Sequence, residues 1–382
     1  MRSPAQWGVA LGLVAGLACS QEHSTVERVG VEADSGATPL ADGPDSAQDG
    51  EAEASDAGAD ASPNPTTPGP VPLTMLGSTQ YKGLAGGLYP AGSNDVPAAH
   101  LTAGILRAQA LTPLATDGAA SASGKMVLLS IGMSNTTQEF CAASSTAPCT
   151  SWSFAGQAAA DSAVDHSRLM IVNGAQASSV ASFWDEVSDP DYSRVKGKLE
   201  AQGLSERQVV AAWVKVANPA PHTSLPDPNA DAYALMATLG NIVRAMHVHY
   251  PNLRLVFLSS RIYAGYATSP LNPEPFAYES GFAVKWAIEA QIRQRETGAI
   301  DPRVGDLLPD PAAPWVGWGP YLWANGTSPR EDGLTWAPSD FEPADGTHPA
   351  RSAEEKVGRM LLSFFKTSPV TRCWFLQSGS CN

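Results

Sequence analysis

Four short apolar segments at regular intervals constrain the fold of this chain more than any other feature. Each is nearly continuous in apolar residues rather than alternating, which is typical of strands buried on both faces of a parallel sheet. They start about 40 residues apart, which leaves room for a strand, a crossover helix and loops. The segments are residues 126–131, 169–172, 209–214 and 253–258, and a fifth candidate lies within 314–323.

The stretches between these segments contain helical patterns. Apolar side chains recur at helical spacing over residues 230–250, and a second helix is predicted over 278–297, ended by Gly298. A Ser-x-x-Glu capping box starting at Ser352 predicts a last helix. The alternation predicts an α/β protein with three α/β/α layers around a mainly parallel, doubly wound (flavodoxin-like) sheet, in one domain over residues 73–382.

Polar residues directly follow the apolar segments. Ser134 follows the first segment, Gly174 the second and Asn218 the third, while Asp345 and His348 stand just before the last predicted helix. Ligands of doubly wound sheets bind at the carboxyl ends of the strands. We therefore expect these five residues to meet at one edge of the sheet.

This set of residue types suits acyl transfer. A serine hydroxyl needs an adjacent base, which His348 can supply, and Asp345 can hold the imidazole in the required tautomer. The backbone N–H groups of Ser134 and Gly174 and the side-chain amide of Asn218 are candidate oxyanion donors. Each residue alone has a simpler explanation as a turn former or cap. Their combination in this chain order points to a serine hydrolase.

With these residues in place, the sequence resembles the SGNH (GDSL-like) hydrolase superfamily over roughly residues 125–365. Residues 345–349 read Asp-Gly-Thr-His-Pro, which matches the superfamily's Asp-x-x-His-Pro block ahead of a C-terminal helix. The resemblance implies an ester hydrolase without a metal or organic cofactor. It also implies site roles: Ser134 as nucleophile, Asp345 and His348 completing the triad, and Gly174 and Asn218 in the oxyanion hole.

Two blocks depart from the superfamily pattern. Met133 stands where its Gly-Asp-Ser block has Asp, and residues 216–219 keep only Asn218 of its Gly-x-Asn-Asp block. Pro219 favours an extended conformation for Asn218, which can place the amide without the missing residues. Asn173 is a competing candidate for the oxyanion amide.

The first residues have the pattern of an export signal. Residues 1–19 contain a short positive start and an apolar core, and small residues before Cys19 resemble a bacterial lipoprotein signal in which Cys19 is lipidated. Simple secretion, with cleavage after Ala18, is the alternative. Residues 20–72 are predicted to form a disordered acidic, Pro-rich linker. Both alternatives place the protein outside the cytoplasm, facing the periplasm or the cell exterior.

Charge and cysteine spacing exclude other functions. The formal charge of −14 argues against a nucleic-acid partner, which would need a basic surface. The only membrane contact we expect is through a lipid at Cys19. No cysteine pair has the spacing of a metal site, and in an exported chain two disulfides are expected. The candidates form two pairs eight residues apart, although three pairings are possible: Cys141, Cys149, Cys373 and Cys381.

Several residues are candidates for binding substrate. Arg261 and Tyr263 follow the fourth segment and could reach a polar ligand. Trp318 and Trp323 lie in an aromatic-rich region and could stack on sugar rings, although packing against the last strand is the alternative. Residues 73–124 are expected to form an ordered N-terminal extension without assigned chemistry.

The sequence thus predicts a serine esterase that hydrolyses a carboxylic ester through an acyl-enzyme on Ser134. We expect the substrate to be an ester-bearing small molecule or polysaccharide, with an acyl or acetyl group on a carbohydrate. One alternative is a non-catalytic surface carbohydrate-binding protein on the same fold. Another is an O-acyltransferase that uses the same triad, with a sugar hydroxyl in place of water.

Overall fold

The computed structural model describes residues 69–142, 148–308 and 314–381. These residues lie in a compact unit that spans Asn64–Asn382. The predicted signal peptide, Cys19 and nearly all of the 20–72 linker lie outside the described residues.

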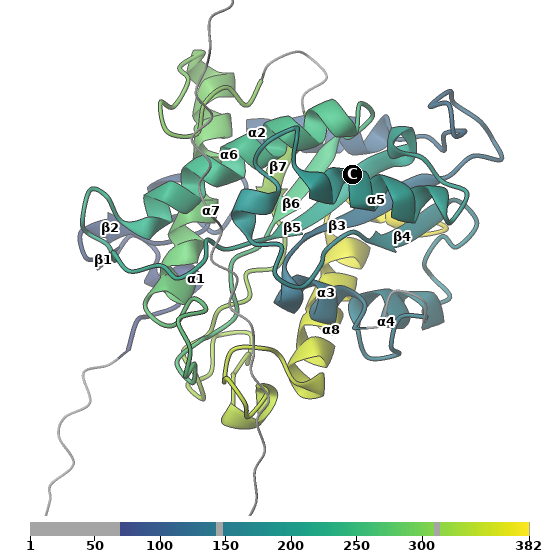
Figure 1. The fold of residues 1–382 in the computed structure, drawn as a ribbon. Coiled ribbons are helices and arrows are strands. Elements are labelled where there is room, and N and C mark those ends of the chain that lie inside the picture. Colours follow the sequence, from purple (N-terminus) through teal and green to yellow (C-terminus); the bar gives the residue numbers. More distant parts are fainter. Residues whose placement is uncertain (1–68, 143–147, 309–313, 382) are drawn as a thin grey trace, which may run out of the picture. The chain divides into compact units, whose positions relative to one another are not determined.

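Five parallel strands form the central sheet in the order β4-β3-β5-β6-β7 (Figure 1). Every residue of β3 and β5 is buried, which explains why the apolar segments are continuous rather than alternating. All five predicted strands, the fifth candidate included, are confirmed. They are β3 (Met126–Gly132), β4 (Leu169–Asn173), β5 (Val209–Lys215), β6 (Leu255–Leu258) and β7 (Trp315–Trp318).

Helices cover both faces of this sheet, so the predicted three-layer α/β/α fold is confirmed. One core cluster joins alternate residues of β3, such as Val127 and Leu129, to α5 (Pro190–Glu200), α6 (Asp231–His249) and α7 (Phe276–Thr297). The opposite cluster joins the intervening residues, such as Leu128, to the helices of the other layer. These are α2 (Ala98–Gln109), α4 (Phe154–Ala160), α8 (Arg351–Thr367) and α9 (Arg372–Phe375).

Two of the predicted helix ends can be compared with the structure. Gly298 ends α7 in the left-handed conformation, with φ of 75°, as the sequence pattern predicted. The predicted capping box of α8 is wrong. The helix begins after Ala350, and the Ser352 hydroxyl donates to Asp340 Oδ1 at 2.7 Å.

The segment before the sheet is ordered and packs on the edge strand β7. It contains α1 (Leu73–Leu76), a small hairpin of β1 (Gln80–Tyr81) and β2 (Leu84–Ala85), and α2. The indole N–H of Trp315 donates to the backbone oxygen of His100 in α2 at 2.8 Å, and the two rings stack. At this edge of the sheet, His100 Nε2 lies 2.9 Å from the backbone oxygen of Val316, and the Val316 N–H donates to Gln291 Oε1 of α7 at 2.8 Å.

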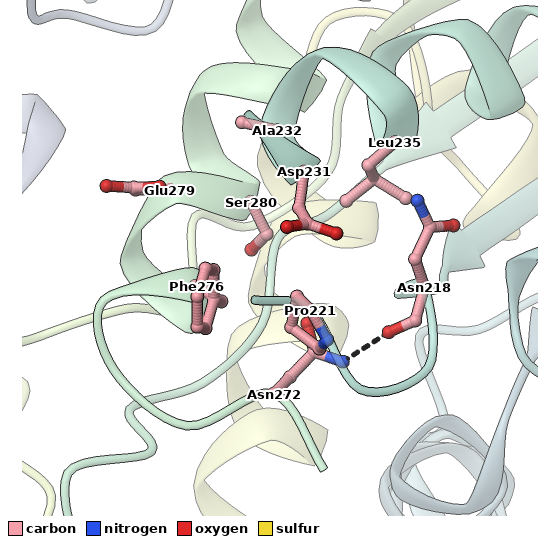
Figure 2. Close-up of a pocket in the computed structure, with 9 residues that line it drawn as sticks. All are labelled: Asn218, Pro221, Asp231, Ala232, Leu235, Asn272, Phe276, Glu279 and Ser280. Atoms are coloured by element: carbon pink, nitrogen blue, oxygen red, sulfur yellow. Dashed lines mark hydrogen bonds between the residues drawn. The ribbon is translucent and has the colours of Figure 1, made fainter. Parts of the chain in front are cut away.

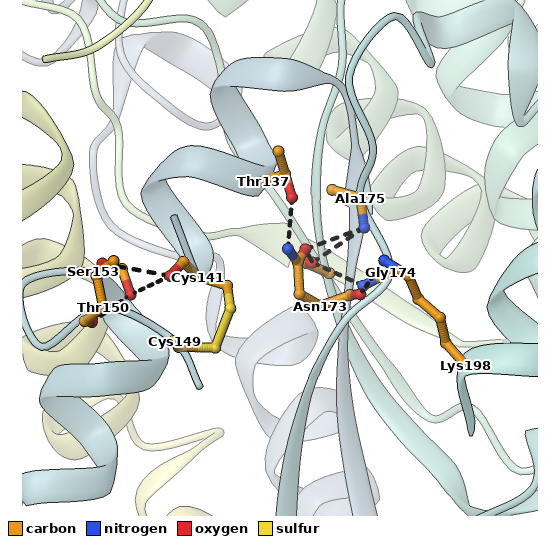
Figure 3. The surroundings of a disulfide bond; sticks show 10 residues. Thr137, Cys141, Cys149, Thr150, Ser153, Asn173, Gly174, Ala175 and Lys198 are labelled. Carbon is orange, nitrogen blue, oxygen red and sulfur yellow. Dashed lines mark hydrogen bonds between the residues drawn. A yellow bond between two sulfur atoms is a disulfide. The ribbon is translucent and has the colours of Figure 1, made fainter. Parts of the chain in front are cut away.

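Both disulfides join neighbouring cysteines. Cys141 pairs with Cys149 and Cys373 with Cys381, which confirms the local use predicted for them. Figure 3 shows the first pair, where the hydroxyl of Ser153 donates to the backbone oxygen of Cys141 at 2.9 Å. This disulfide lies after α3 (Ser134–Phe140), so it anchors the end of that helix.

Among the described residues, no helix combines the length and the apolar character needed to cross a membrane.

Candidate active site

The strand order places the candidate site where the chain changes direction across the sheet. From β3 the chain crosses to β4 on one side, and it then returns to β5, β6 and β7 on the other side. A crevice at such a point is where doubly wound proteins bind ligands. Ser134 is the first residue of α3, directly after β3, and Asn218 follows β5. The two therefore follow the adjacent strands that flank the switch point.

A chain of hydrogen bonds joins Ser134, His348 and Asp345. His348 Nε2 lies 2.8 Å from Ser134 Oγ, and His348 Nδ1 lies 2.5 Å from Asp345 Oδ2. Because an ionised carboxylate only accepts hydrogen bonds, the imidazole proton is on Nδ1, which leaves Nε2 as an acceptor for the serine hydroxyl. The side chains of His348 and Asp345 are each about one quarter exposed, so solvent reaches the group.

The turn that carries Asp345 and His348 is closely constrained. Asp345 Oδ1 accepts the backbone N–H groups of Thr347 and His348 at 2.8 and 2.9 Å. Burial alone would raise the pKa of Asp345, but these hydrogen bonds and the one from the His348 ring lower it below its ordinary value. Gly346 has φ of 60°, and a Cβ there would lie 1.9 Å from the backbone oxygen of Tyr266. Only glycine fits this turn.

The backbone N–H of Gly174, which the sequence predicted as an oxyanion donor, is engaged within the protein in this structure. This N–H donates to Oγ of Ser130, a residue of the neighbouring strand β3, at 3.2 Å. A Cβ at Gly174 would lie 2.5 Å from the backbone oxygen of Ser130, so glycine is needed for close approach to β3. Asn173, the competing amide, is also engaged (Figure 3): its Oδ1 accepts from Ser130 Oγ at 2.7 Å and its Nδ2 donates to Thr137 Oγ1 at 2.5 Å.

Asn218 keeps its side-chain amide available. Its backbone oxygen accepts a hydrogen bond from Asn272 Nδ2 at 2.6 Å, whereas its half-buried side chain makes no hydrogen bond to any described residue. Figure 2 shows the amide pointing away from Asn272, beside Leu235. The cavity that these residues line with Asp231 has a volume of about 10 Å³, the size of a single water.

The loop after β4 contains two backbone N–H groups that make no hydrogen bond to a described residue. Its two ends are fixed by backbone hydrogen bonds, from Gln176 to the oxygen of Gly132 at 3.1 Å and from Ala181 to that of Ala217 at 3.0 Å. The loop thus connects the residues that precede Ser134 and Asn218. Within it, the N–H groups of Ala177 and Ser178 have no acceptor in the described part of the chain.

Three of the four predicted substrate-binding side chains are buried in the core. Arg261, Trp318 and Trp323 are 2%, 4% and 0% exposed. The indole N–H of Trp318 donates to the backbone oxygen of Leu88 at 2.7 Å, and that of Trp323 to Glu274 Oε1 at 2.7 Å. Their low exposure leaves little side-chain surface for a ligand, and for the two tryptophans it favours the alternative of packing against the last strand.

The fourth candidate, Tyr263, remains half-buried. Its ring packs against Tyr266 and Trp323, with centroid separations of 5.1 and 6.0 Å. Tyr266 belongs to the segment on which the turn of Asp345 is seated, so Tyr263 lies close to the candidate site in the fold.

A fully buried ion pair fastens the helix that carries Ser134 to β5. Lys215 Nζ contacts both carboxylate oxygens of Glu139, and both side chains are 0% exposed. Thr136 Oγ1, on the same helix, donates to the backbone oxygen of Lys215 at 2.5 Å. Burial raises the pKa of Glu139 and lowers that of Lys215 to about 8. The charge of the buried Arg261 also acts on Glu139.

Nothing in the described ranges forms a group of three or more His, Cys, Asp or Glu side chains placed to hold a metal ion. The candidate site therefore consists of a serine, an imidazole and a carboxylate with hydrogen-bond donors nearby. Such an arrangement can generate a nucleophile and stabilise an oxyanion.

The sequence matches no family model and no curated protein. Solved structures that are similar include an acetylxylan esterase, Axe2, from Geobacillus stearothermophilus (15% identity, 66% of this chain and 97% of that chain, TM-score 0.35). A carbohydrate esterase family 2 enzyme from Corynascus thermopiles (Myceliophthora fergusii) shares 14% identity over 65% of this chain and 68% of that chain, with a TM-score of 0.34.

The esterase EstA from Pseudoalteromonas sp. shares 11% identity over 63% of this chain and 96% of that chain, with a TM-score of 0.31. Similarity of this degree assigns no activity to the chain.

Proposed function

We propose that this protein is a serine esterase of the SGNH type, with Ser134, His348 and Asp345 as its triad. The observation that carries the proposal is the hydrogen-bonded chain from Ser134 Oγ through both nitrogens of His348 to Asp345. The serine and the Asp345–His348 turn lie more than 200 residues apart in the sequence. Packing of the fold does not require a partly exposed serine hydroxyl to meet an imidazole that a carboxylate holds in place.

The reaction follows from this geometry. His348 Nε2 removes the hydroxyl proton as Ser134 Oγ attacks the ester carbonyl, and Asp345 stabilises the imidazolium that forms. Collapse of the tetrahedral intermediate expels the alcohol, which takes the proton from His348. Water, activated by His348 in the same way, then hydrolyses the acyl-enzyme and releases the acid. No step requires a cofactor.

The oxyanion would be held by donors that are free in this structure. Ser134 N–H lies at the start of α3 without an intrahelical acceptor, and the Asn218 amide is unengaged. Because Gly174 donates to Ser130, we place the remaining donor in the loop after β4, at Ala177 or Ser178. Removing one oxyanion donor typically lowers kcat by about 10²–10³.

For the substrate, we propose a short acyl group, such as acetyl, on a carbohydrate hydroxyl. Ser134 and His348 are partly exposed, and the cavity beside Asn218 has a volume of about 10 Å³, which is too small to enclose a long acyl chain. An open site admits a bulky alcohol such as a polysaccharide. Trp318 and Trp323 are 4% and 0% exposed, so their rings offer little surface for the sugar stacking that a purely carbohydrate-binding function would use.

We also propose that the protein acts outside the cytoplasm. Two local disulfides suit an oxidising compartment. Lipidation at Cys19 would hold the domain at a membrane through the 20–72 linker. Metabolic labelling with a fatty-acid analogue tests this anchor, because Cys19→Ala should abolish incorporation while leaving esterase activity in place.

A fluorophosphonate probe tests the nucleophile. We expect the full chain to form an adduct on Ser134, located by peptide mass spectrometry, and Ser134→Ala and His348→Ala to form none. Ser259→Ala is the matched control, because Ser259 also follows a strand at this edge but its hydroxyl is engaged by Trp213 and Pro320. An adduct at another residue, or one that survives His348→Ala at an unchanged rate, would contradict the triad.

A series of esters tests the substrate class. We expect acetylated xylo-oligosaccharides and p-nitrophenyl acetate to be hydrolysed with release of free acetate, and p-nitrophenyl palmitate to be at least about tenfold poorer. Preference for the long chain would contradict the short-acyl proposal. Transfer of acetyl to an added sugar in place of acetate release would identify an acyltransferase.

A further inference from the structure

The side chain of Asn135 connects the two segments that carry the proposed nucleophile and base. Asn135 follows Ser134 in α3 and is 1% exposed. Its Nδ2 donates to the backbone oxygen of Thr347 at 3.0 Å, across a sequence separation of 212 residues. Thr347 immediately precedes His348 and is itself 1% exposed. The bond therefore links the neighbours of Ser134 and His348 inside the core.

Other contacts hold the same turn from its opposite side. The N–H of Thr268 donates to the backbone oxygen of Asp345 at 2.9 Å, and Gly346 lies against Tyr266. These contacts place the turn relative to the segment after β6, which does not carry Ser134. The bond from Asn135 places the same turn relative to α3, so it bears on the separation between Ser134 Oγ and His348 Nε2.

The buried oxygen of Thr347 makes this bond consequential. A buried carbonyl oxygen without a donor destabilises the folded state. If the donor is removed, we expect the turn to shift so that this oxygen reaches another donor or water. A displacement of about 1 Å between reacting groups can lower a rate by about 10². Asn135 Oδ1 also lies 3.5 Å from Ser134 Oγ, but the shorter contact of 2.8 Å to His348 governs the hydroxyl.

We propose that Asn135 is a positioning residue that sets the distance between Ser134 Oγ and His348 Nε2 through its bond to the backbone of Thr347. This inference rests on the proposed esterase function. Because Asn135 is 1% exposed and acts on His348 through the backbone of Thr347, its loss should slow chemistry without weakening substrate binding.

The test compares Asn135→Ala with Gln208→Ala in the full chain. Gln208 is also buried, and its amide donates to the backbone oxygen of Leu114 at 2.6 Å, but it lies at the opposite end of β5. We expect both variants to lower the melting temperature by similar amounts. Only Asn135→Ala should lower kcat for p-nitrophenyl acetate and the fluorophosphonate labelling rate, by about 10- to 100-fold, with KM within about twofold of the original value.

The outcomes distinguish failure of the positioning role of Asn135 from failure of the proposed esterase function. If Asn135→Ala is labelled and turns over at the original rate while Ser134→Ala does neither, the positioning role is overturned and the esterase stands. If the unsubstituted protein is not labelled at Ser134, both proposals fail. Should Asn135→Ala not fold, Asn135→Asp keeps the side-chain shape without the donor, and an unchanged labelling rate in that variant overturns the inference.

Discussion

Removing either partner of the buried ion pair between Glu139 and Lys215 should destabilise the protein. The loss of unfolding free energy should depend on pH in opposite directions for the two variants. Both side chains are 0% exposed, and each lies among few other charges apart from Arg261. Glu139→Gln leaves an ammonium in the core beside a second buried cation. Lys215→Met leaves a carboxylate that still lies in the field of Arg261. We therefore expect Glu139→Gln to be the more destabilising substitution at neutral pH.

The magnitude follows from the cost of neutralising the remaining group. A lysine with an ordinary pKa of about 10.4 must release its proton at pH 7, at about 1.36 kcal/mol for each of about 3.4 pH units, or about 4.6 kcal/mol. A glutamate with an ordinary pKa of about 4.3 must gain one, for about 3.7 kcal/mol. Arg261 reduces the second cost, because its charge favours the ionised carboxylate. Both are large fractions of a total stability of about 5–15 kcal/mol.

Urea unfolding at pH 5, 7 and 9 measures these free energies. In Glu139→Gln the folded-state pKa of Lys215 falls further below its unfolded value. Because burial already lowers the pKa of Lys215 to about 8 in the original protein, the deficit should shrink by about 1.4 kcal/mol between pH 7 and 8 and change little from pH 8 to 9. In Lys215→Met the folded-state pKa of Glu139 rises above its unfolded value, so the deficit should shrink as pH falls from 7 towards 5.

Combining Glu139→Gln with Lys215→Met should recover most of the lost stability, because no unpaired charge of this pair remains. Equal deficits for the two single variants at all three pH values would refute this reasoning.

Four further predictions concern the site. Asp345→Asn should lower kcat by about 10⁴ in an ester assay at pH 7–8 with a small effect on KM, and a loss below tenfold would exclude an orienting role. In the original protein, the hydrogen bonds to Asp345 lower the pKa of its carboxyl, so titration by NMR should place its midpoint below that of an ordinary aspartate, and a midpoint above it would contradict this. Asn218→Ala should lower kcat by about 10²–10³, and unchanged turnover would remove it from the oxyanion hole. Gly346→Ala should lower the melting temperature more than Gly298→Ala, because both glycines have positive φ but only at Gly346 would a Cβ meet another atom, the backbone oxygen of Tyr266.

The sequence by itself determined the strands and where their polar ends fall. Continuous apolar segments such as Met126–Gly132 can be predicted as strands because both faces of a strand in a parallel sheet are buried. The carboxyl ends of such strands share one edge, so Ser134 and Asn218 could be placed at the same edge without coordinates. Asp345 and His348 are three residues apart in one turn, and that local spacing is also visible in the sequence.

Only the tertiary structure decided which groups are free and which are engaged. Gly174 has the position expected of an oxyanion donor, but the hydroxyl of Ser130, on another strand, takes its N–H. Arg261 follows a strand in the same way as Ser134 but is buried. The bond from Asn135 to Thr347 spans 212 residues. Burial and hydrogen-bond partners are set by segments distant in the chain, so residue type and local spacing cannot report them.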